Sequence, residues 1–322
     1  MEKTVAVLGL RVPALDVEES VLGELGVTLV RALGGSPDEV VDSAREADVI
    51  LAGSLPRFPA EVLKALPRLK AIVRFGIGVD NIDQREAKAR GIAVANVPDY
   101  CIPEVATHTV ALILAAARRL LSASQSAREG RWAVDAVRPL PPCEAQTVGL
   151  VGFGRIAQGV ATRLHPFGFR VAAADPAAHE SVARALAVEI VPFEALLAKA
   201  DILSLHVPLT KATRHLLSRQ ALTQMKTGAY VINTARGGLI DEAALLEALD
   251  SGQLAGAALD VFEVEPPAAD QPLLHHPRVM VTPHVAWYSE RAAIDMRRKA
   301  AEEARRFLRG EPLRNPVTSE DA

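Results

Sequence analysis

The sequence predicts an α/β protein of two domains, each built on a doubly wound parallel β-sheet with helices on both faces. Short apolar runs alternate with amphipathic helical patterns along the chain. The runs are continuous rather than alternating, which is typical of strands buried on both faces of a parallel sheet. A Pro-rich stretch at residues 137–146 interrupts the alternation once, and 322 residues suit two domains better than one.

The predicted strands form two groups, one before and one after the Pro-rich stretch. The first group is residues 4–10, 27–33, 48–53, 70–75 and 92–97. The second group is residues 147–153, 170–175, 201–207, 229–234, 255–261 and 278–284. Helical patterns lie between the strands, and two longer helices are expected at residues 104–121 and 289–308.

The composition is that of a globular protein able to bury a large core, with 49% apolar and 23% charged residues. The formal net charge is −3, so no basic surplus exists to neutralise a nucleic-acid backbone, and no direct nucleic-acid partner is expected. Cys101 and Cys143 cannot form a metal cluster by themselves. They suggest a reducing compartment more than a disulfide framework.

The N-terminus has a short apolar run but no pattern of a secretory signal peptide. The segment most similar to a membrane span is residues 104–121, but it contains His108 and its apolar part stops at Arg118. That is short of the roughly 20 continuous apolar residues that a span needs. We therefore expect a buried or interface helix there, no membrane partner and a cytoplasmic location.

A glycine-rich turn follows the strand predicted at residues 147–153. Its sequence from Gly152 to Ala157 is GFGRIA, a G-x-G-x-x-A pattern that opens a helix. Gly152 permits the tight turn, Gly154 lets the backbone approach a pyrophosphate, and the small Ala157 lets helix and strand pack closely. The N-terminus of the helix supplies free N–H groups for phosphate oxygens.

An acidic residue makes this turn more specific, because glycine-rich turns also occur without a ligand. Asp175 ends the next predicted strand, 21 residues after Gly154. Dinucleotide-binding folds place there the carboxylate that accepts hydrogen bonds from a ribose 2′-OH. A carboxylate at this position repels a 2′-phosphate, and no arginine follows it directly. The turn therefore predicts an NAD(H) site, and Asp175 opposes the alternative of an NADP-dependent reductase.

Arg236, Glu265 and His284 each follow one of the last three predicted strands, at the sheet edge where such folds bind ligands. Singly, they have ordinary explanations: a surface arginine, a solvated loop acid and a polar cap. Together, beside a dinucleotide site, they suit hydride transfer to a 2-oxo acid. Arg236 can bind the substrate carboxylate or carbonyl. His284 can donate a proton to the developing alkoxide, and Glu265 can orient its ring.

Other polar patterns fit catalysis less well. His206 ends a predicted strand without an evident partner, so a structural role is expected for it. Ser204 and His206 do not form a nucleophile elbow, so a hydrolase is not supported. No H-E-x-x-H, Cys-x-x-Cys or clustered acidic pattern is present, and no metal is expected.

Four motifs in order resemble those of the NAD-dependent D-isomer-specific 2-hydroxyacid dehydrogenases. They are residues 149–161, 231–245, 255–267 and 279–290, and residues 74–98 match the N-terminal domain of that family as well. The resemblance covers nearly the whole chain. It implies an NAD-dependent oxidoreductase acting on the CH–OH group of a D-2-hydroxy acid. It also implies that Arg236 binds substrate, that His284 is the proton donor and that Glu265 is the acid beside it.

The same resemblance, together with the glycine-rich turn, gives the expected ligand-binding residues. The expected cofactor-binding residues are Thr109, Gly152, Gly154, Arg155, Ile156, Asp175, Val207, Thr234, Ala235, Asp260, His284 and Trp287. The expected substrate-binding residues are Ile77, Gly78, Arg236 and Trp287. The backbone around Ile77 and Gly78 would face the substrate carboxylate.

In that family, a Rossmann NAD-binding domain is inserted into a flavodoxin-like substrate domain. The resemblance therefore implies a substrate domain of residues 1–99 plus 289–322 and an NAD-binding domain of residues 100–288. It also implies a homodimer formed through the helix region at residues 104–121.

Within the family, residues 282–310 look most similar to the C-terminal-binding-protein branch, which includes NAD(H)-binding corepressors. A second hypothesis is therefore an NAD(H)-sensing scaffold that uses the same fold to bind partner proteins. The short tail at residues 315–322 favours the enzyme. No regulatory domain is expected after the last helix, which disfavours a long phosphoglycerate dehydrogenase. Trp287 either lines the substrate pocket and favours an apolar substrate tail, or packs at the domain interface.

Overall fold

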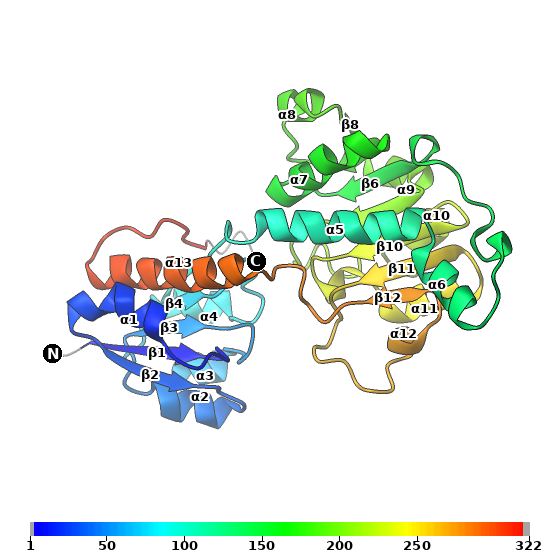
Figure 1. Ribbon diagram of the computed structural model, residues 1–322. Helices are drawn as coiled ribbons and strands as arrows, with labels where there is room; N and C mark the ends of the chain where they lie inside the picture. The colour runs from blue at the N-terminus through cyan, green and yellow to red at the C-terminus, as the bar shows by residue number, and fades with distance from the viewer. Residues whose placement is uncertain (1–2, 318–322) are drawn as a thin grey trace. The chain divides into compact units, whose positions relative to one another are not determined.

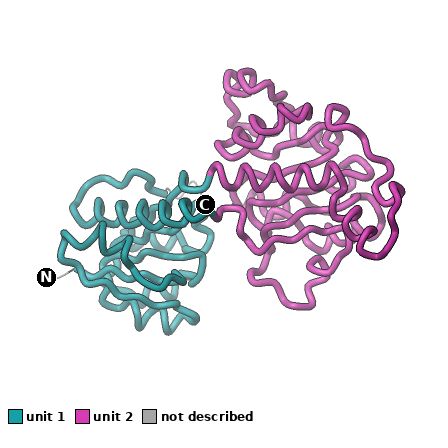
Figure 2. The backbone as a smooth tube through the Cα atoms, viewed as in Figure 1, with its two compact units in different colours: residues 1–101, 289–322 teal, residues 102–288 magenta. Residues whose placement is uncertain are grey.

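The computed structural model describes residues 3–317 of the chain. The chain divides into two compact units (Figure 2): unit 1 is residues 1–101 with 289–322, and unit 2 is residues 102–288. Each unit contains its own parallel β-sheet surrounded by helices (Figure 1). The predicted fold class, an α/β chain with two doubly wound parallel sheets, is confirmed.

Unit 1 is built on a five-stranded parallel sheet with strand order β2-β1-β3-β4-β5. Its strands are β1 (Thr4–Leu8), β2 (Thr28–Ala32), β3 (Val49–Ala52), β4 (Ala71–Arg74) and β5 (Ala93–Ala95). Its helices are α1 (Asp16–Leu22), η1 (Gly23–Leu25), α2 (Pro37–Ala44), α3 (Ala60–Lys64), α4 (Gln84–Ala89) and α13 (Glu290–Leu308). All of β3 is buried, which explains why its sequence is apolar at every position.

Helix α13 completes unit 1 from the far end of the sequence. It begins after Ser289, whose hydroxyl accepts a hydrogen bond from the amide of Ala292 at 3.0 Å. The helix packs against α1, β3 and β4. Its Arg297 donates to the buried carboxylate of Glu18 in α1 at 2.6 Å. The chain therefore leaves the first sheet, forms unit 2 and returns.

Unit 2 is built on a seven-stranded parallel sheet with strand order β12-β11-β10-β9-β6-β7-β8. Its strands are β6 (Thr147–Val151), β7 (Arg170–Ala174), β8 (Glu189–Ile190), β9 (Ile202–Leu205), β10 (Ala229–Asn233), β11 (Leu254–Leu259) and β12 (Val279–Val281). The direction of the strand order reverses at β6, which lies between β7 and β9. Ligands of doubly wound sheets bind beyond the carboxyl ends of the strands at such a reversal.

Helices cover both faces of the sheet of unit 2. They are α5 (Ile102–Ala117), α6 (Leu120–Arg128), η2 (Val134–Val137), η3 (Cys143–Ala145), α7 (Arg155–Leu164), η4 (His165–Phe167), α8 (Glu180–Ala185), α9 (Phe193–Lys199), α10 (Arg219–Gln224), η5 (Gly237–Leu239), α11 (Glu242–Asp250) and α12 (Pro272–His275). Side chains of α5 and α7 build one apolar core with the sheet. Side chains of α9, α10 and α11 build another. The strands are thus apolar because both of their faces are covered.

Two elements of unit 2 differ from the prediction. The helix expected at residues 104–121 ends at Ala117, and α6 follows after a bend of 60°. Arg119, between the two helices, has a left-handed backbone with a φ of 50°, which interrupts the helical hydrogen bonds. The sequence does not predict the edge strand β8, because two residues are too few to show a periodic pattern.

Within residues 3–317, no single helix is both long and apolar enough to cross a membrane. Only α5 and α6 taken together reach that length and composition, and they are sharply bent against each other. Leu112 and Ile113 of α5 are buried in the apolar core of unit 2.

Candidate active site

The glycine-rich turn joins β6 to α7 at the point where the strand order reverses. Gly152 has a φ of 91°, and a Cβ atom there would meet a backbone carbonyl oxygen at 2.8 Å, so only glycine fits. Gly154 is the N-cap of α7, and the place of its Cβ is open space. Arg155 and Ile156 begin the helix, and Ala157 is fully buried. The turn therefore presents the N–H groups of a helix N-terminus in a place that admits a phosphate.

Asp175 follows β7 and lies directly beside that turn. One carboxylate oxygen accepts a hydrogen bond from the amide of Phe153 at 2.7 Å, and the other accepts one from Ala177 at 2.8 Å. Each oxygen of an ionised carboxylate can accept a second hydrogen bond. Asp175 can therefore hold the turn in place and still receive the hydroxyl groups of a ribose.

The carboxylate of Asp260 organises the loop that follows β12. Asp260 is buried, with 1% of its surface exposed. Its Oδ1 accepts hydrogen bonds from the hydroxyl of Thr282 at 2.5 Å and the amide of Val285 at 2.9 Å. Its Oδ2 accepts one from the amide of Ala286 at 3.0 Å. These bonds offset the cost of burying the carboxylate, and they hold residues 282–286 in one arrangement.

His284 lies on this loop, and its side chain meets Glu265. The Nδ1 atom of His284 is 2.6 Å from Oε2 of Glu265, and each side chain is 35% exposed. The backbone of His284 is left-handed, with a φ of 53°, and its amide donates to the carbonyl of Asp260 at 2.8 Å. Residues held in this backbone region by their surroundings are concentrated at functional sites. Because Nδ1 is engaged by Glu265, Nε2 is the ring nitrogen left for a substrate.

The surroundings of Glu265 favour its ionised form. Burial by itself raises the pKa of this carboxyl, but the hydrogen bond and charge of His284, the Phe262 amide and the charge of Arg236 lower it. The result is a pKa below the ordinary value for glutamate. The Phe262 amide donates to Oε1 at 3.0 Å. Glu265 is therefore a carboxylate at neutral pH, able to orient the imidazole of His284.

Arg236 is held just beyond β10 by a buried asparagine. The side chain of Asn233 accepts a hydrogen bond from the amide of Ala235 at 3.0 Å and donates one to the carbonyl of Arg236 at 2.8 Å. The guanidinium of Arg236 donates to the carbonyl of Ala235 at 2.7 Å. Its charge also acts on Glu265. The structure thus brings Arg236, Glu265 and His284 to one edge of the sheet of unit 2.

Other residues expected to bind the cofactor lie in the loops of the same unit. The hydroxyl of Thr109 in α5 is 2.8 Å from that of Thr234, which follows β10. Val207 follows β9. The ring of Trp287 meets that of Tyr288 edge-on, with 5.5 Å between the ring centres and 84° between the planes.

The residues expected to bind the substrate belong to different units. Ile77 and Gly78 follow β4 in unit 1, whereas Arg236 and Trp287 lie in unit 2. The side-chain amide of Asn96 donates to the carbonyl of Ile77 at 2.6 Å and fixes that loop. The structure thus places Arg236 at the same sheet edge as Glu265 and His284, whereas the roles of Ile77 and Gly78 stay predictions.

The residues that hold these side chains in place are not predicted from the sequence. Asn233 binds the loop that follows its own strand, through the carbonyl of Arg236. Thr282 binds Asp260 at the end of the neighbouring strand, so this bond depends on which strands are neighbours. His108 is noticeable in the sequence as a polar residue within an apolar helix. Its partner Thr282 lies 174 positions further along the chain, so a single sequence gives no indication of the pair.

His206, which follows β9, is expected to make folding pH-dependent. Burial lowers the pKa of His206 from 6.5 to about 4, and its Nε2 lies 2.9 Å from the hydroxyl of Ser204. As the pH falls, the unfolded chain therefore binds a proton on His206 before the folded chain does. The free energy of unfolding decreases between pH 6.5 and about pH 4, by at most about 3 kcal/mol. We expect His206→Asn to flatten this pH dependence in urea unfolding. The exposed His179, replaced by asparagine, is the control, and an unchanged slope in His206→Asn would contradict the prediction.

Unit 2 has the strand order of a dinucleotide-binding α/β domain. As in such domains, a glycine-rich turn lies where the strand order reverses, and an acidic residue follows the next strand. Residues 110–286 match the family described as D-isomer specific 2-hydroxyacid dehydrogenase, NAD binding domain. The chain belongs to this family, and the resemblance inferred from its motifs is confirmed.

Relatives of this chain include enzymes of different lengths. The chain is 43% identical to the hydroxypyruvate reductase of Thermotoga maritima over 250 residues, which are 77% of this chain and 80% of that protein. It is 39% identical to a D-3-phosphoglycerate dehydrogenase of Archaeoglobus fulgidus over 284 residues, 88% of this chain but 54% of that protein. The chain thus spans about half the length of that relative. Its fold matches that of D-lactate dehydrogenase from Aquifex aeolicus complexed with NAD and lactic acid, with a TM-score of 0.86. The two chains are 29% identical, and the match covers 95% of this chain and 96% of the other.

These comparisons establish the family but not the branch within it. The three proteins above have the names of dehydrogenases and reductases, and none has that of a C-terminal-binding protein. Similarity to that branch therefore stays a prediction. A corepressor-like scaffold is not favoured by these relatives.

Proposed function

We propose that the protein interconverts a 2-oxo acid and the corresponding D-2-hydroxy acid, with NAD(H) as the hydride carrier. The observation that carries the proposal is the pairing of His284 with Glu265, 2.6 Å apart, at the sheet edge that also holds Arg236. A proton donor, a carboxylate that orients it and a cation for the substrate are the groups that reduction of a 2-oxo acid needs. They lie in the unit whose glycine-rich turn suits a dinucleotide.

In the proposed reaction the nicotinamide supplies or accepts the hydride. Arg236 binds the carboxylate or the carbonyl oxygen of the 2-oxo acid through charge-assisted hydrogen bonds. His284, oriented through Nδ1 by Glu265, donates a proton from Nε2 to the oxygen that becomes the hydroxyl. In the reverse direction Nε2 of His284 accepts that proton.

NAD is the proposed cofactor, held by the loops of unit 2. The proposed contacts are Thr109, Gly152, Gly154, Arg155, Ile156, Asp175, Val207, Thr234, Ala235, Asp260, His284 and Trp287. Asp260 accepts three hydrogen bonds from the loop at residues 282–286, which carries His284, another of these proposed contacts.

Asp175 is expected to select NADH over NADPH. Its carboxylate would accept hydrogen bonds from a ribose 2′-OH and repel a 2′-phosphate. We therefore expect Asp175→Ala to lower the ratio of kcat/KM for NADH to that for NADPH by about tenfold or more. Glu180→Ala, which removes an exposed acid of the nearby α8, is the matched control and should leave the ratio unchanged. An unaltered preference in Asp175→Ala would assign cofactor selection to other residues.

The proposed substrate is a small 2-oxo acid, as the names of the reductase and lactate dehydrogenase relatives suggest. Unit 1 is proposed as the substrate domain, with the backbone around Ile77 and Gly78 facing the substrate carboxylate. Trp287 is proposed to line the substrate pocket and to favour an apolar tail. The alternative, in which Trp287 only packs at the domain interface, predicts no change in side-chain preference when Trp287 is replaced by alanine.

Oxidation of NADH by the purified protein against a panel of 2-oxo acids tests the proposed function. The panel runs from glyoxylate, pyruvate and hydroxypyruvate to branched and thioether-bearing acids. We expect at least one member to react with a kcat/KM above roughly 10⁴ M⁻¹s⁻¹, the lower range for enzymes, and to give the D-product. If tryptophan fluorescence shows that NADH binds but no acid is reduced, the NAD(H)-sensing scaffold becomes the better explanation.

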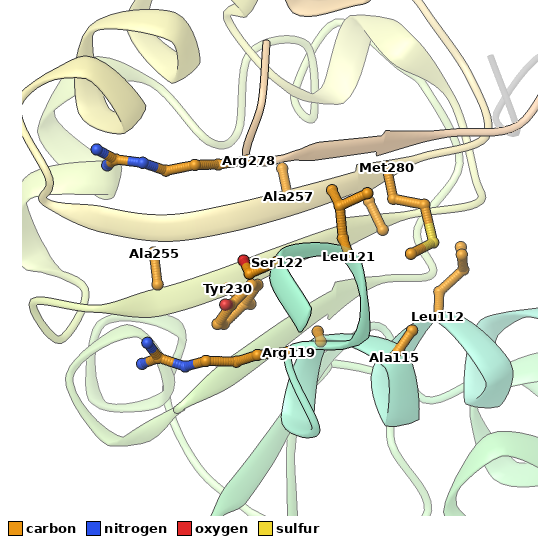
Figure 3. A pocket seen from close by; sticks show the side chains of 12 residues that line it. Leu112, Ala115, Arg119, Leu121, Ser122, Tyr230, Ala255, Ala257, Arg278 and Met280 are labelled. Atoms are coloured by element: carbon orange, nitrogen blue, oxygen red, sulfur yellow. The ribbon is translucent and has the colours of Figure 1, made fainter. Parts of the chain in front are cut away.

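We also propose a homodimer formed through the region of α5 and α6. A pocket opens between these helices and strands β10 to β12, with Leu112, Leu121 and Met280 in its apolar lining (Figure 3). The neighbouring Leu120 is 53% exposed, and a second copy of the chain packed against this region would cover it. Light scattering during size-exclusion chromatography tests the proposal, and a monomer at micromolar concentration would contradict it.

A cytoplasmic location is proposed from the chemistry of the chain. Cys101 and Cys143 are not joined in a disulfide, which suits a reducing compartment. With a net charge of −3, neither nucleic acid nor an anionic membrane surface is proposed as a partner. Fractionation of cells that produce the protein tests the location.

A further inference from the structure

His108 lies in α5 and is not one of the residues proposed to bind cofactor or substrate. Its Nε2 is 3.2 Å from the hydroxyl oxygen of Thr282 and 3.9 Å from Oδ1 of Asp260. The side chain of His108 is 24% exposed, whereas that of Asp260 is completely buried. Helix α5 thus reaches the loop on which His284 lies through His108.

The direction of each hydrogen bond follows from the partners. A threonine hydroxyl has one proton, and the oxygen of Asp260 at 2.5 Å from Thr282 is an acceptor, so this proton points to the carboxylate. The oxygen of Thr282 must then accept a hydrogen bond from His108. The chain of donors therefore runs from Nε2–H of His108 to Thr282, and from Thr282 to Asp260.

Asp260 also accepts hydrogen bonds from main-chain amides of the loop that carries His284. The same Oδ1 that receives the Thr282 hydroxyl also accepts the amide of Val285 at 2.9 Å. The main-chain carbonyl of Asp260 accepts the amide of His284 at 2.8 Å. Hydrogen bonds that share a buried acceptor depend on one another. In the low dielectric of the interior each bond is stronger, and the loss of one leaves a buried polar group without a partner at a high cost in free energy.

We propose that His108 is a positioning residue for His284, acting through Thr282 and Asp260. The proposal rests on the function proposed above, in which His284 donates the proton. Without His108, the hydroxyl of Thr282 loses its donor and the loop loses its tie to α5. A misplacement of about 1 Å can cost roughly 10²-fold in rate, so a small loosening of the loop has a measurable effect.

Hydrogen exchange in the protein without cofactor or substrate tests the tie itself. We expect the amides of Val285 and Ala286 to exchange at least about tenfold faster in His108→Leu, because their acceptor is less well fixed. His108→Gln should stay close to the wild-type protein, since its side-chain amide can donate to Thr282 from the place of Nε2. Thr282→Val removes the same link and also the hydroxyl that donates to Asp260, so its amides should exchange at least as fast as those of His108→Leu. This variant provides the test if the leucine variant does not fold.

Steady-state kinetics test whether the tie serves catalysis. We expect His108→Leu to lower kcat about tenfold while the KM for the 2-oxo acid stays within about twofold, and His108→Gln to restore most of kcat. Addition of His108→Leu to Thr282→Val should cause little further loss, because Thr282→Val has already removed the acceptor of His108. Replacement of the exposed His179 by leucine is the control.

Unchanged exchange at Val285 and Ala286 in His108→Leu would overturn the proposal, and so would a glutamine variant as slow as the leucine variant. The two hypotheses remain separable. If the wild-type protein reduces no 2-oxo acid, the proposed function fails, whereas hydrogen exchange still decides whether His108 fixes the loop.

Discussion

Replacement of His284 by glutamine is expected to lower turnover of the 2-oxo acid by roughly 10²–10⁴-fold, the usual contribution of a general acid. Glutamine can still donate a hydrogen bond to Glu265, but it cannot transfer a proton to the oxygen that becomes the hydroxyl. The loop should keep its place, because its order depends on the main chain of residue 284 and on Asp260. The rate of the single-turnover reaction with bound NADH measures the effect.

His275→Gln is the matched control for this substitution. His275 is an exposed histidine of α12 in the same unit, and its Nε2 lies 2.7 Å from the main-chain carbonyl oxygen of Ala269. Its replacement should leave turnover within about twofold of the wild-type value. If His284→Gln binds NADH and turns over substrate at the wild-type rate, then another group supplies the proton.

The fold could be predicted from the sequence because its main signal is local. A strand covered on both faces needs apolar residues at every position, and β3 and β6 satisfy this within a few residues. The glycine-rich turn is equally local, because the φ of 91° at Gly152 restricts that position to glycine. The bend at Arg119 is different, since a left-handed arginine depends on tertiary contacts that no short pattern contains.

The candidate site could be predicted in part, for a topological reason. Parallel strands end at the same edge of a sheet, so the residues that follow them, such as Arg236 and His284, were expected to lie near one another. The contact between His284 and Glu265 and the effect of Arg236 on Glu265 agree with this. Thr282, which helps to fix this geometry, bonds to Asp260 at the end of the neighbouring strand, and this pairing depends on a strand order that the sequence does not state.

Replacement of Arg236 by leucine is expected to lower kcat/KM for the 2-oxo acid by about 10²-fold, with most of the change in KM. Loss of a charge-assisted hydrogen bond to a desolvated carboxylate costs about 3 kcal/mol, which corresponds to that factor. Arg236→Lys keeps the charge but not the planar pair of donors, so a loss of roughly tenfold is expected. NADH affinity should be unchanged, since Asn233 holds the main chain of Arg236 independently of its side chain.

Arg219→Leu is the control for this series, because it removes an exposed arginine of α10 that pairs with Glu247. Titration of each variant with the 2-oxo acid and, separately, with NADH distinguishes loss of substrate binding from loss of cofactor binding. A KM that rises in Arg236→Leu alone, with an unchanged Kd for NADH, assigns the substrate carboxylate or carbonyl to the guanidinium. If that KM does not rise, the substrate is held by other groups, and the backbone around Ile77 and Gly78 becomes the principal candidate.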